Sequence, residues 1–95
     1  MLYASTSRAL ACLETLVHLA RTAFPFNRCL IELEVPAEAW AARAVFEPAA
    51  HVGWDAVPHG LVSLDWGTAW ARSGTSLLAE VPSALVAEES NVLLN

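Results

Sequence analysis

The segment from about Ser7 to Ala23 constrains the fold most, because it predicts a helix that is apolar on nearly every side. The hydroxyl side chains at residues 5–7 are typical helix N-caps, which places the start of the helix there. Between positions 9 and 20 the polar residues are Glu14, Thr15 and His18. A helix with so little polar surface needs apolar partners around most of its circumference. The segment therefore predicts one long buried helix inside a layered domain.

Strand patterns alternate with this helix along the chain. Residues 29–35 alternate apolar and acidic side chains and stop at Pro36, which is typical of a half-exposed strand. We expect short strands near residues 1–5, 29–35 and 76–86, short helices at 36–46 and 64–72, and an irregular loop at 47–60. The fold class that follows is α+β, with a small mixed sheet and one long buried helix.

Composition limits both the partners and the size of this domain. The 95 residues are 56% hydrophobic and 16% charged, which excludes intrinsic disorder and leaves room for one domain, residues 1–95. The net charge of −5 and the scattered arginines argue against direct nucleic-acid binding. Charged residues interrupt every long apolar run, so we expect no membrane helix. The apolar excess indicates a homo-oligomer or a piece of a larger domain.

Cysteine usage and the N-terminus bear on location. The chain starts without a charged region followed by an apolar stretch, so we expect no signal peptide. Cys12 and Cys29 lie in apolar runs, and we interpret them as reduced, buried thiols of a cytoplasmic protein. The three histidines have no metal-ligand spacing, which predicts no metal site. Trp66 and Trp70 share a helix face, which favours a core or interface position over base stacking.

Three residues are candidates for chemistry. Glu14 lies on the apolar helix, where a carboxylate must be paired or protonated. Its alternative interpretation is an edge residue that pairs with Arg21. Ser83 follows Pro82 at the end of an apolar strand, where a hydroxyl can either project from a rigid turn or simply stabilise the turn. Tyr3 is a weaker candidate at the start of the first strand.

Several segments together resemble a known family. The matching runs are residues 3–5, 9–19, 35–36, 53–55 and 67–95. They are similar to the RES-domain family, the toxins of bacterial Res–Xre toxin–antitoxin modules. The family is named after an arginine, a glutamate and a serine, and by position Glu14 matches the glutamate and Ser83 the serine. Tyr3 matches a tyrosine that lines the ligand pocket.

The resemblance implies a fold similar to ADP-ribosyltransferases and an activity that degrades NAD by cleaving the nicotinamide–ribose bond. NAD is then a substrate, with no separate cofactor, and Glu14 and Ser83 are the expected catalytic residues, with Tyr3 binding substrate. The partner it implies is an Xre-like helix-turn-helix antitoxin that blocks the pocket. The family arginine lies upstream of the tyrosine and has no counterpart here, since Arg8 does not fit its motif. We therefore expect a partial RES-like domain.

Two functional hypotheses remain open at this point. One is a RES-type enzyme that degrades NAD by hydrolysis or phosphorolysis, in a truncated form. The alternative is a non-catalytic remnant that binds an antitoxin or associates with itself. Catalysis requires Glu14 and Ser83, 69 positions apart, to meet in one cleft with Tyr3 at its wall. We expect this meeting, which needs the end of the last strand to pack beside the first helix.

Overall fold

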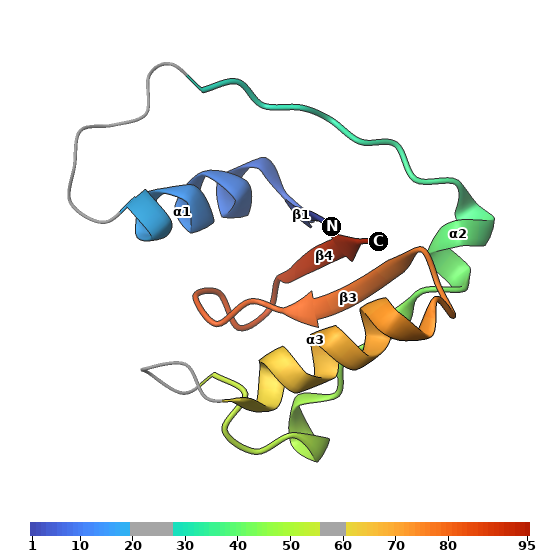
Figure 1. Cartoon of the computed structure of the whole chain (residues 1–95). Coiled ribbons are helices and arrows are strands. Elements are labelled where there is room, and N and C mark those ends of the chain that lie inside the picture. The colour runs from blue at the N-terminus through green and yellow to red at the C-terminus, as the bar shows by residue number, and fades with distance from the viewer. Residues whose placement is uncertain (20–27, 56–60) are drawn as a thin grey trace.

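The computed structural model describes residues 1–19, 28–55 and 61–95, and in these ranges the protein is an α+β domain built on one mixed sheet (Figure 1). The four strands lie in the order β1-β4-β3-β2. Their bounds are Leu2–Ser5 for β1, Ala44–Val45 for β2, Leu78–Pro82 for β3 and Ser90–Leu94 for β4. The pairs β1–β4 and β3–β4 are antiparallel, and β2–β3 is parallel. The predicted fold class is confirmed.

Strand β4 was not predicted, although it is one of the two inner strands of the sheet. It lies between β1 and β3, with Ser5 and Val81 both opposite Asn91. This pairing brings the two ends of the chain side by side (Figure 1). The sequence pattern had suggested that residues 84–86 resume the preceding strand. They form a loop instead, because the Ser83 hydroxyl accepts the backbone N–H groups of Leu85 and Val86.

Three α-helices and one 3₁₀ turn surround the sheet. They are α1 at Arg8–Leu19, α2 at Ala37–Ala41, α3 at Leu61–Ser73 and the turn at Pro48–Ala50. The predicted helix at 64–72 is therefore confirmed as part of α3, and that at 36–46 is shorter than expected. Gly74, with φ of 61°, follows α3 in the left-handed conformation that commonly ends helices. None of the helices in the described ranges is long and apolar enough to cross a membrane.

The predicted strand at 29–35 is wrong. Residues 28–36 have no regular secondary structure and run outside the sheet between α1 and α2 (Figure 1). Ile31 is 78% exposed. Alternating apolar and polar side chains are compatible with a strand, but a strand also needs a neighbouring strand for its backbone hydrogen bonds. The described residues offer no such neighbour to this segment.

The expectation that the first helix is buried on most sides is also wrong. In α1 Leu10 is 1% exposed, whereas Val17 is 49% exposed. Cys12 and Cys29 are exposed free cysteines, not buried ones. The reason is geometric: α1 packs against β1 and, through Glu14, contacts Ser83 and Asn91, whereas Leu13 and Leu16 as well as Val17 stay exposed on its other side. The end of the predicted helix, residues 20–23, lies outside the described residues.

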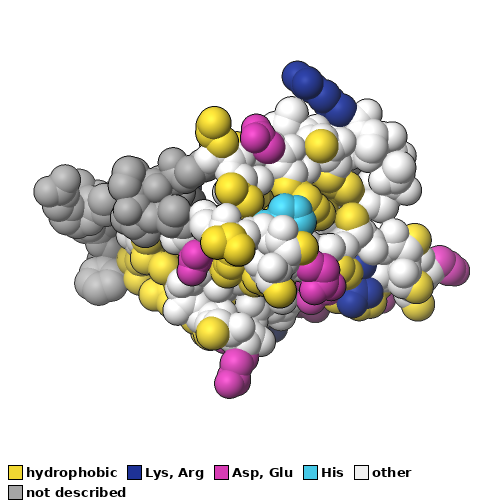
Figure 2. Space-filling view, turned by 90° about the horizontal axis from the view of Figure 1, so that it is seen from below, with side chains coloured by type: hydrophobic (Ala, Val, Ile, Leu, Met, Phe, Trp, Pro, Cys, Tyr) yellow, Lys and Arg dark blue, Asp and Glu magenta, His cyan; other side chains and the backbone are white. Residues whose placement is uncertain are grey.

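The core lies between the sheet and the helices. Its buried apolar side chains are Leu10, Phe46, Trp70, Leu78, Ala79 and Val92. Phe46 stacks on His51 at 4.6 Å between ring centroids and meets Trp66 edge-on at 5.0 Å. Many other apolar side chains stay at the surface, and Figure 2 shows them interspersed with carboxylates on the face seen from below. The tryptophan pair therefore belongs to packing, as the simpler interpretation predicted.

Candidate functional site

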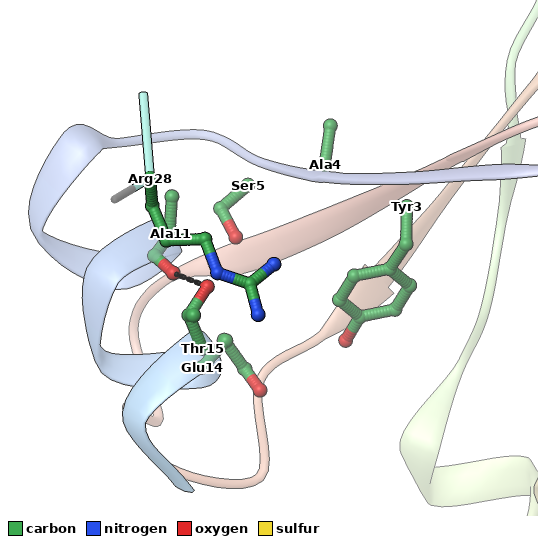
Figure 3. Close-up of a pocket in the computed structure, with 7 residues that line it drawn as sticks. All are labelled: Tyr3, Ala4, Ser5, Ala11, Glu14, Thr15 and Arg28. Atoms are coloured by element: carbon green, nitrogen blue, oxygen red, sulfur yellow. Dashed lines mark hydrogen bonds between the residues drawn. The ribbon is translucent and has the colours of Figure 1, made fainter. Parts of the chain in front are cut away.

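A pocket of about 290 Å³ lies between β1 and the middle of α1 (Figure 3). Its lining residues are Tyr3, Ala4, Ser5, Ala11, Glu14, Thr15 and Arg28. Two of the three predicted site residues, Glu14 and Tyr3, are therefore on its wall. The pocket combines one carboxylate, one phenol, one guanidinium and small side chains, which is a composition suited to a polar ligand.

The connection between β1 and α1 fixes where Glu14 lies. Ser7 caps α1, because its hydroxyl accepts the Leu10 N–H at 3.1 Å and donates to the Glu89 carboxylate. The backbone N–H of Thr6 donates to the Ser90 carbonyl at 3.1 Å, which ties the same turn to β4. Glu14 comes one helical turn after Leu10 and so shares the face that Leu10 buries. The helix thus turns Glu14 toward the sheet.

Glu14 and Ser83 meet, as their predicted shared site requires. The Ser83 hydroxyl donates to Glu14 Oε1 at 3.1 Å, and the Asn91 side-chain amide donates to the same oxygen at 2.7 Å. Within the described part of the chain, Glu14 Oε2 accepts no hydrogen bond. Among the described residues, one carboxylate oxygen therefore has two donors and the other has none.

The expectation that Ser83 opens on the same cleft as Glu14 and Tyr3 is wrong, because Ser83 is buried behind Glu14 and does not line the pocket. It is 3% exposed, and its oxygen accepts the N–H groups of Leu85 at 3.0 Å and Val86 at 3.1 Å. A hydroxyl has one donor and two acceptor positions, and these contacts use all three. In this arrangement Ser83 touches a ligand only through Glu14. The same hydroxyl thus stabilises the turn through Leu85 and Val86 and contacts Glu14, so the two interpretations of Ser83 do not exclude each other.

Tyr3 lies at the opposite wall of the pocket. Partial burial, and secondarily the negative charge of Glu14, raise the pKa of Tyr3 from 10.0 to about 12. Like an ordinary tyrosine, the phenol is neutral at physiological pH and can donate a hydrogen bond, and the raised pKa extends this to more alkaline solutions. Figure 3 shows the ring of Tyr3 and the side chain of Glu14 on either side of the open space.

Three residues at this site were missed by sequence reasoning. Asn91 lies behind Glu14, whereas Ser5 is on the pocket wall, and the Ser5 hydroxyl donates to Asn91 Oδ1 at 2.6 Å. The signal for Asn91 was present, since it is a polar residue directly before the apolar run at 92–94. Arg28 enters the pocket from the segment after α1, as Figure 3 shows. No local pattern marks Arg28, because its position depends on the path of an irregular segment.

Of the other titratable candidates, His51 is not among the residues that line this pocket. His51 accompanies the 3₁₀ turn, where its Nδ1 lies 3.0 Å from the Glu47 carbonyl oxygen. His59 and Arg21, the alternative partner for Glu14, lie outside the described residues, as does the side chain of His18. Among the residues that the structure describes, no three His, Cys, Asp or Glu side chains gather in a way that could hold a metal ion.

The fold and the site together define the class of this protein: it is a small α+β domain with a pocket built around a hydrogen-bonded carboxylate. The family model of the RES domain matches residues 1–95, and the chain belongs to the RES domain family. It is 51% identical, over 96 residues and its whole length, to a protein of Sphingobium sp. named Prs ADP-ribosylating toxin. It is 34% identical over 99% of its length to Toxin Res of Yersinia enterocolitica, and 35% identical over its whole length to Toxin Res of Pseudomonas putida.

The chain corresponds to only part of these relatives. It spans 60% of the Sphingobium and Yersinia proteins and 63% of the Pseudomonas protein. All three carry toxin in their names. The match extends over β1, α1 and β4, the elements that build the carboxylate site.

Proposed function

We propose that the protein is a RES-type toxin that degrades NAD by cleaving its nicotinamide–ribose bond in the cytoplasm, and that Glu14 carries the chemistry. The observation that supports this most is the Glu14 carboxylate at the pocket wall, held at one oxygen by Ser83 and Asn91. The toxin names of the relatives support the biological role. NAD enters this proposal as substrate, and no further cofactor is invoked.

The proposed reaction breaks the bond between ribose C1 and the nicotinamide nitrogen. The bonding electron pair leaves with nicotinamide, and positive charge develops on the ribose ring. The Glu14 carboxylate is placed to stabilise that charge, as carboxylates do in glycoside hydrolysis. Water then attacks C1 and gives up a proton, for which Glu14 is the base available in the pocket. With phosphate as the attacking group, the same step is a phosphorolysis.

Other pocket residues suit the rest of the dinucleotide. Arg28 supplies a guanidinium, which pairs with phosphate oxygens in a bidentate manner. It follows Glu14 in the sequence, so it is not a positional counterpart of the family arginine. Tyr3, whose phenol keeps its proton at physiological pH, is placed to donate a hydrogen bond to the substrate. Ser83 acts on the substrate through Glu14.

The proposed partners are an Xre-like antitoxin and a second copy of the protein. An antitoxin segment that enters the pocket would block access to Glu14. Exposed apolar side chains such as Leu2, Leu61 and Leu64 support self-association, because a soluble monomer rarely exposes so much apolar surface. The net charge of −5 disfavours direct contact of this chain with nucleic acid.

A second candidate activity is the transfer of ADP-ribose to a protein. The printed name of the 51% identical Sphingobium relative, an ADP-ribosylating toxin, favours it. Bond cleavage and the role of Glu14 are the same in both activities, and only the acceptor at ribose C1 differs. The non-catalytic alternative, a module that only binds an antitoxin or itself, requires no nicotinamide release under any condition.

One experiment separates these possibilities. The protein is incubated with NAD in three mixtures, with buffer alone, with phosphate, and with bacterial protein extract, and nicotinamide and ADP-ribosyl products are quantified. Free ADP-ribose in buffer supports hydrolysis, a phosphorylated ADP-ribose supports phosphorolysis, and label on protein supports transfer. Absence of nicotinamide in all three mixtures, from a protein that is folded by circular dichroism, would refute the enzymatic proposal.

A further inference from the structure

Asn91 is a buried amide near the start of β4, an inner strand of the sheet. It is 1% exposed, and with Ser83 it is one of two buried polar residues in the described part of the chain. Burying an amide is unfavourable unless its donor and acceptor positions find partners. A buried asparagine directly before the apolar residues 92–94 therefore needs a specific reason for being there.

The contacts of Asn91 determine how its side chain is turned. Its Nδ2 donates to Glu14 Oε1 at 2.7 Å, and its Oδ1 accepts from the Ser5 hydroxyl at 2.6 Å. Because a carboxylate oxygen only accepts, the amide must present its nitrogen to Glu14. That leaves Oδ1 for Ser5, whose hydroxyl must then donate. The two contacts exclude the flipped orientation of the amide.

The strand register makes this arrangement rigid. Ser5 and Asn91 are opposite each other on β1 and β4, so their side chains lie on the same face of the sheet. Strand β4 is paired on both sides, which fixes the position of the Asn91 backbone. Ser83, the other donor to Glu14, lies in the loop after β3 and contacts the carboxylate at a longer distance, 3.1 Å. Asn91 therefore fixes the position of the Glu14 carboxylate more tightly than Ser83 does.

We propose that Asn91, oriented by Ser5, is the positioning residue that sets the rotation of the Glu14 carboxylate and directs Oε2 into the pocket. The effect on catalysis rests on the proposed function. The contact between Asn91 and Glu14 rests on the geometry alone. Asn91 does not line the pocket, so it influences reaction at ribose C1 only through Glu14. A misplaced carboxylate weakens catalysis steeply, because small errors in geometry raise the barrier.

The matched variants Asn91→Asp and Asn95→Asp test this role. At position 91 aspartate keeps the shape and the acceptor for Ser5, but it turns a carboxylate oxygen toward Glu14 in place of the N–H donor. At position 95, an exposed asparagine that contacts the Ala71 carbonyl, the same charge change lies away from Glu14. We expect Asn91→Asp to lower kcat for nicotinamide release by roughly 10–100-fold with KM changed less than about twofold, and Asn95→Asp to leave both unchanged. Wild-type kcat in a folded Asn91→Asp protein, or a loss confined to KM, would overturn the proposal.

A second measurement tests the contact between Asn91 and Glu14 without substrate. It decides the inference even if the Asn91→Asp protein fails to fold. In the unsubstituted protein we expect one Asn91 side-chain amide proton to resonate downfield and exchange slowly by NMR. Glu14→Ala should abolish that signature, and Glu38→Ala, an exposed glutamate in α2, should retain it. A signal that is indifferent to Glu14 overturns the inference. If the unsubstituted protein releases no nicotinamide, the proposed function fails, and the spectra still decide whether Asn91 holds Glu14.

Discussion

The chain contains a single tyrosine, and its titration reports on the charge at Glu14. The pKa of Tyr3 is raised from 10.0 to about 12, first by burial and second by the Glu14 carboxylate. Glu14→Gln removes the second cause and keeps the shape of the side chain. Because burial is the larger cause, the Tyr3 pKa should fall by less than half of the rise, to between about 11 and 12.

The assay is an alkaline titration followed by the ultraviolet absorbance of tyrosinate, with Glu38→Gln as the matched control. The control should titrate like the unsubstituted protein, because Glu38 is exposed in α2. A Tyr3 pKa that stays the same or rises in Glu14→Gln would show that the two side chains do not face one pocket. It would thereby refute the site as described.

The same pKa fixes the sign of a stability change at high pH. Above pH 10 the unfolded chain loses the Tyr3 proton while the folded protein keeps it, so the folded state binds more protons. The contribution of Tyr3 to stability is therefore fully present below about pH 10 and is lost as the pH rises toward about 12. Tyr3→Phe should flatten this part of the pH dependence of urea unfolding.

Two further predictions concern stability. Ser83→Ala leaves the backbone N–H groups of Leu85 and Val86 without their acceptor and removes one of the two donors to Glu14, so we expect a loss of about 1–3 kcal/mol in unfolding free energy by urea denaturation, with Ser63→Ala on the exposed side of α3 unchanged. Equal stability of the two variants would contradict the hydrogen bonds assigned to Ser83. Arg43→Ala removes a 2.6 Å ion pair with Glu80 and a stacking contact on Trp40. The cost should be about 1 kcal/mol and should shrink in high salt, and a loss independent of salt would assign the effect to packing.

Sequence patterns predicted the local features of this fold well where a feature depends on neighbours along the chain. The hydroxyls before α1 mark its start, and Ser7 does cap it. The apolar run at 76–81 contains most of β3. The meeting of Glu14 and Ser83 was predicted because the resemblance placed both in one site, and their hydrogen bond agrees. Whether these residues catalyse a reaction stays a prediction.

The features that sequence reasoning missed depend on pairing across the chain. Residues 29–35 have the alternation of a strand, but a sheet partner decides whether a strand forms. Strand β4 gains its place from pairing with β1 and β3, which the pattern at 90–94 does not reveal. Asn91 can be recognised as a site residue only from the strand register, which places its side chain beside Ser5 and Glu14. Arg28 reaches the pocket by a path that no periodicity describes.

The central claim, that the Glu14 carboxylate drives cleavage of NAD, is tested most directly by the rate of nicotinamide release from Glu14→Gln protein. Glutamine keeps the size of the side chain and an oxygen for Asn91 and Ser83, but it removes the negative charge at the pocket. The account predicts a fall of at least about 100-fold in kcat, with Glu38→Gln unchanged and both variants folded. Nicotinamide release by Glu14→Gln at the unsubstituted rate would contradict the account.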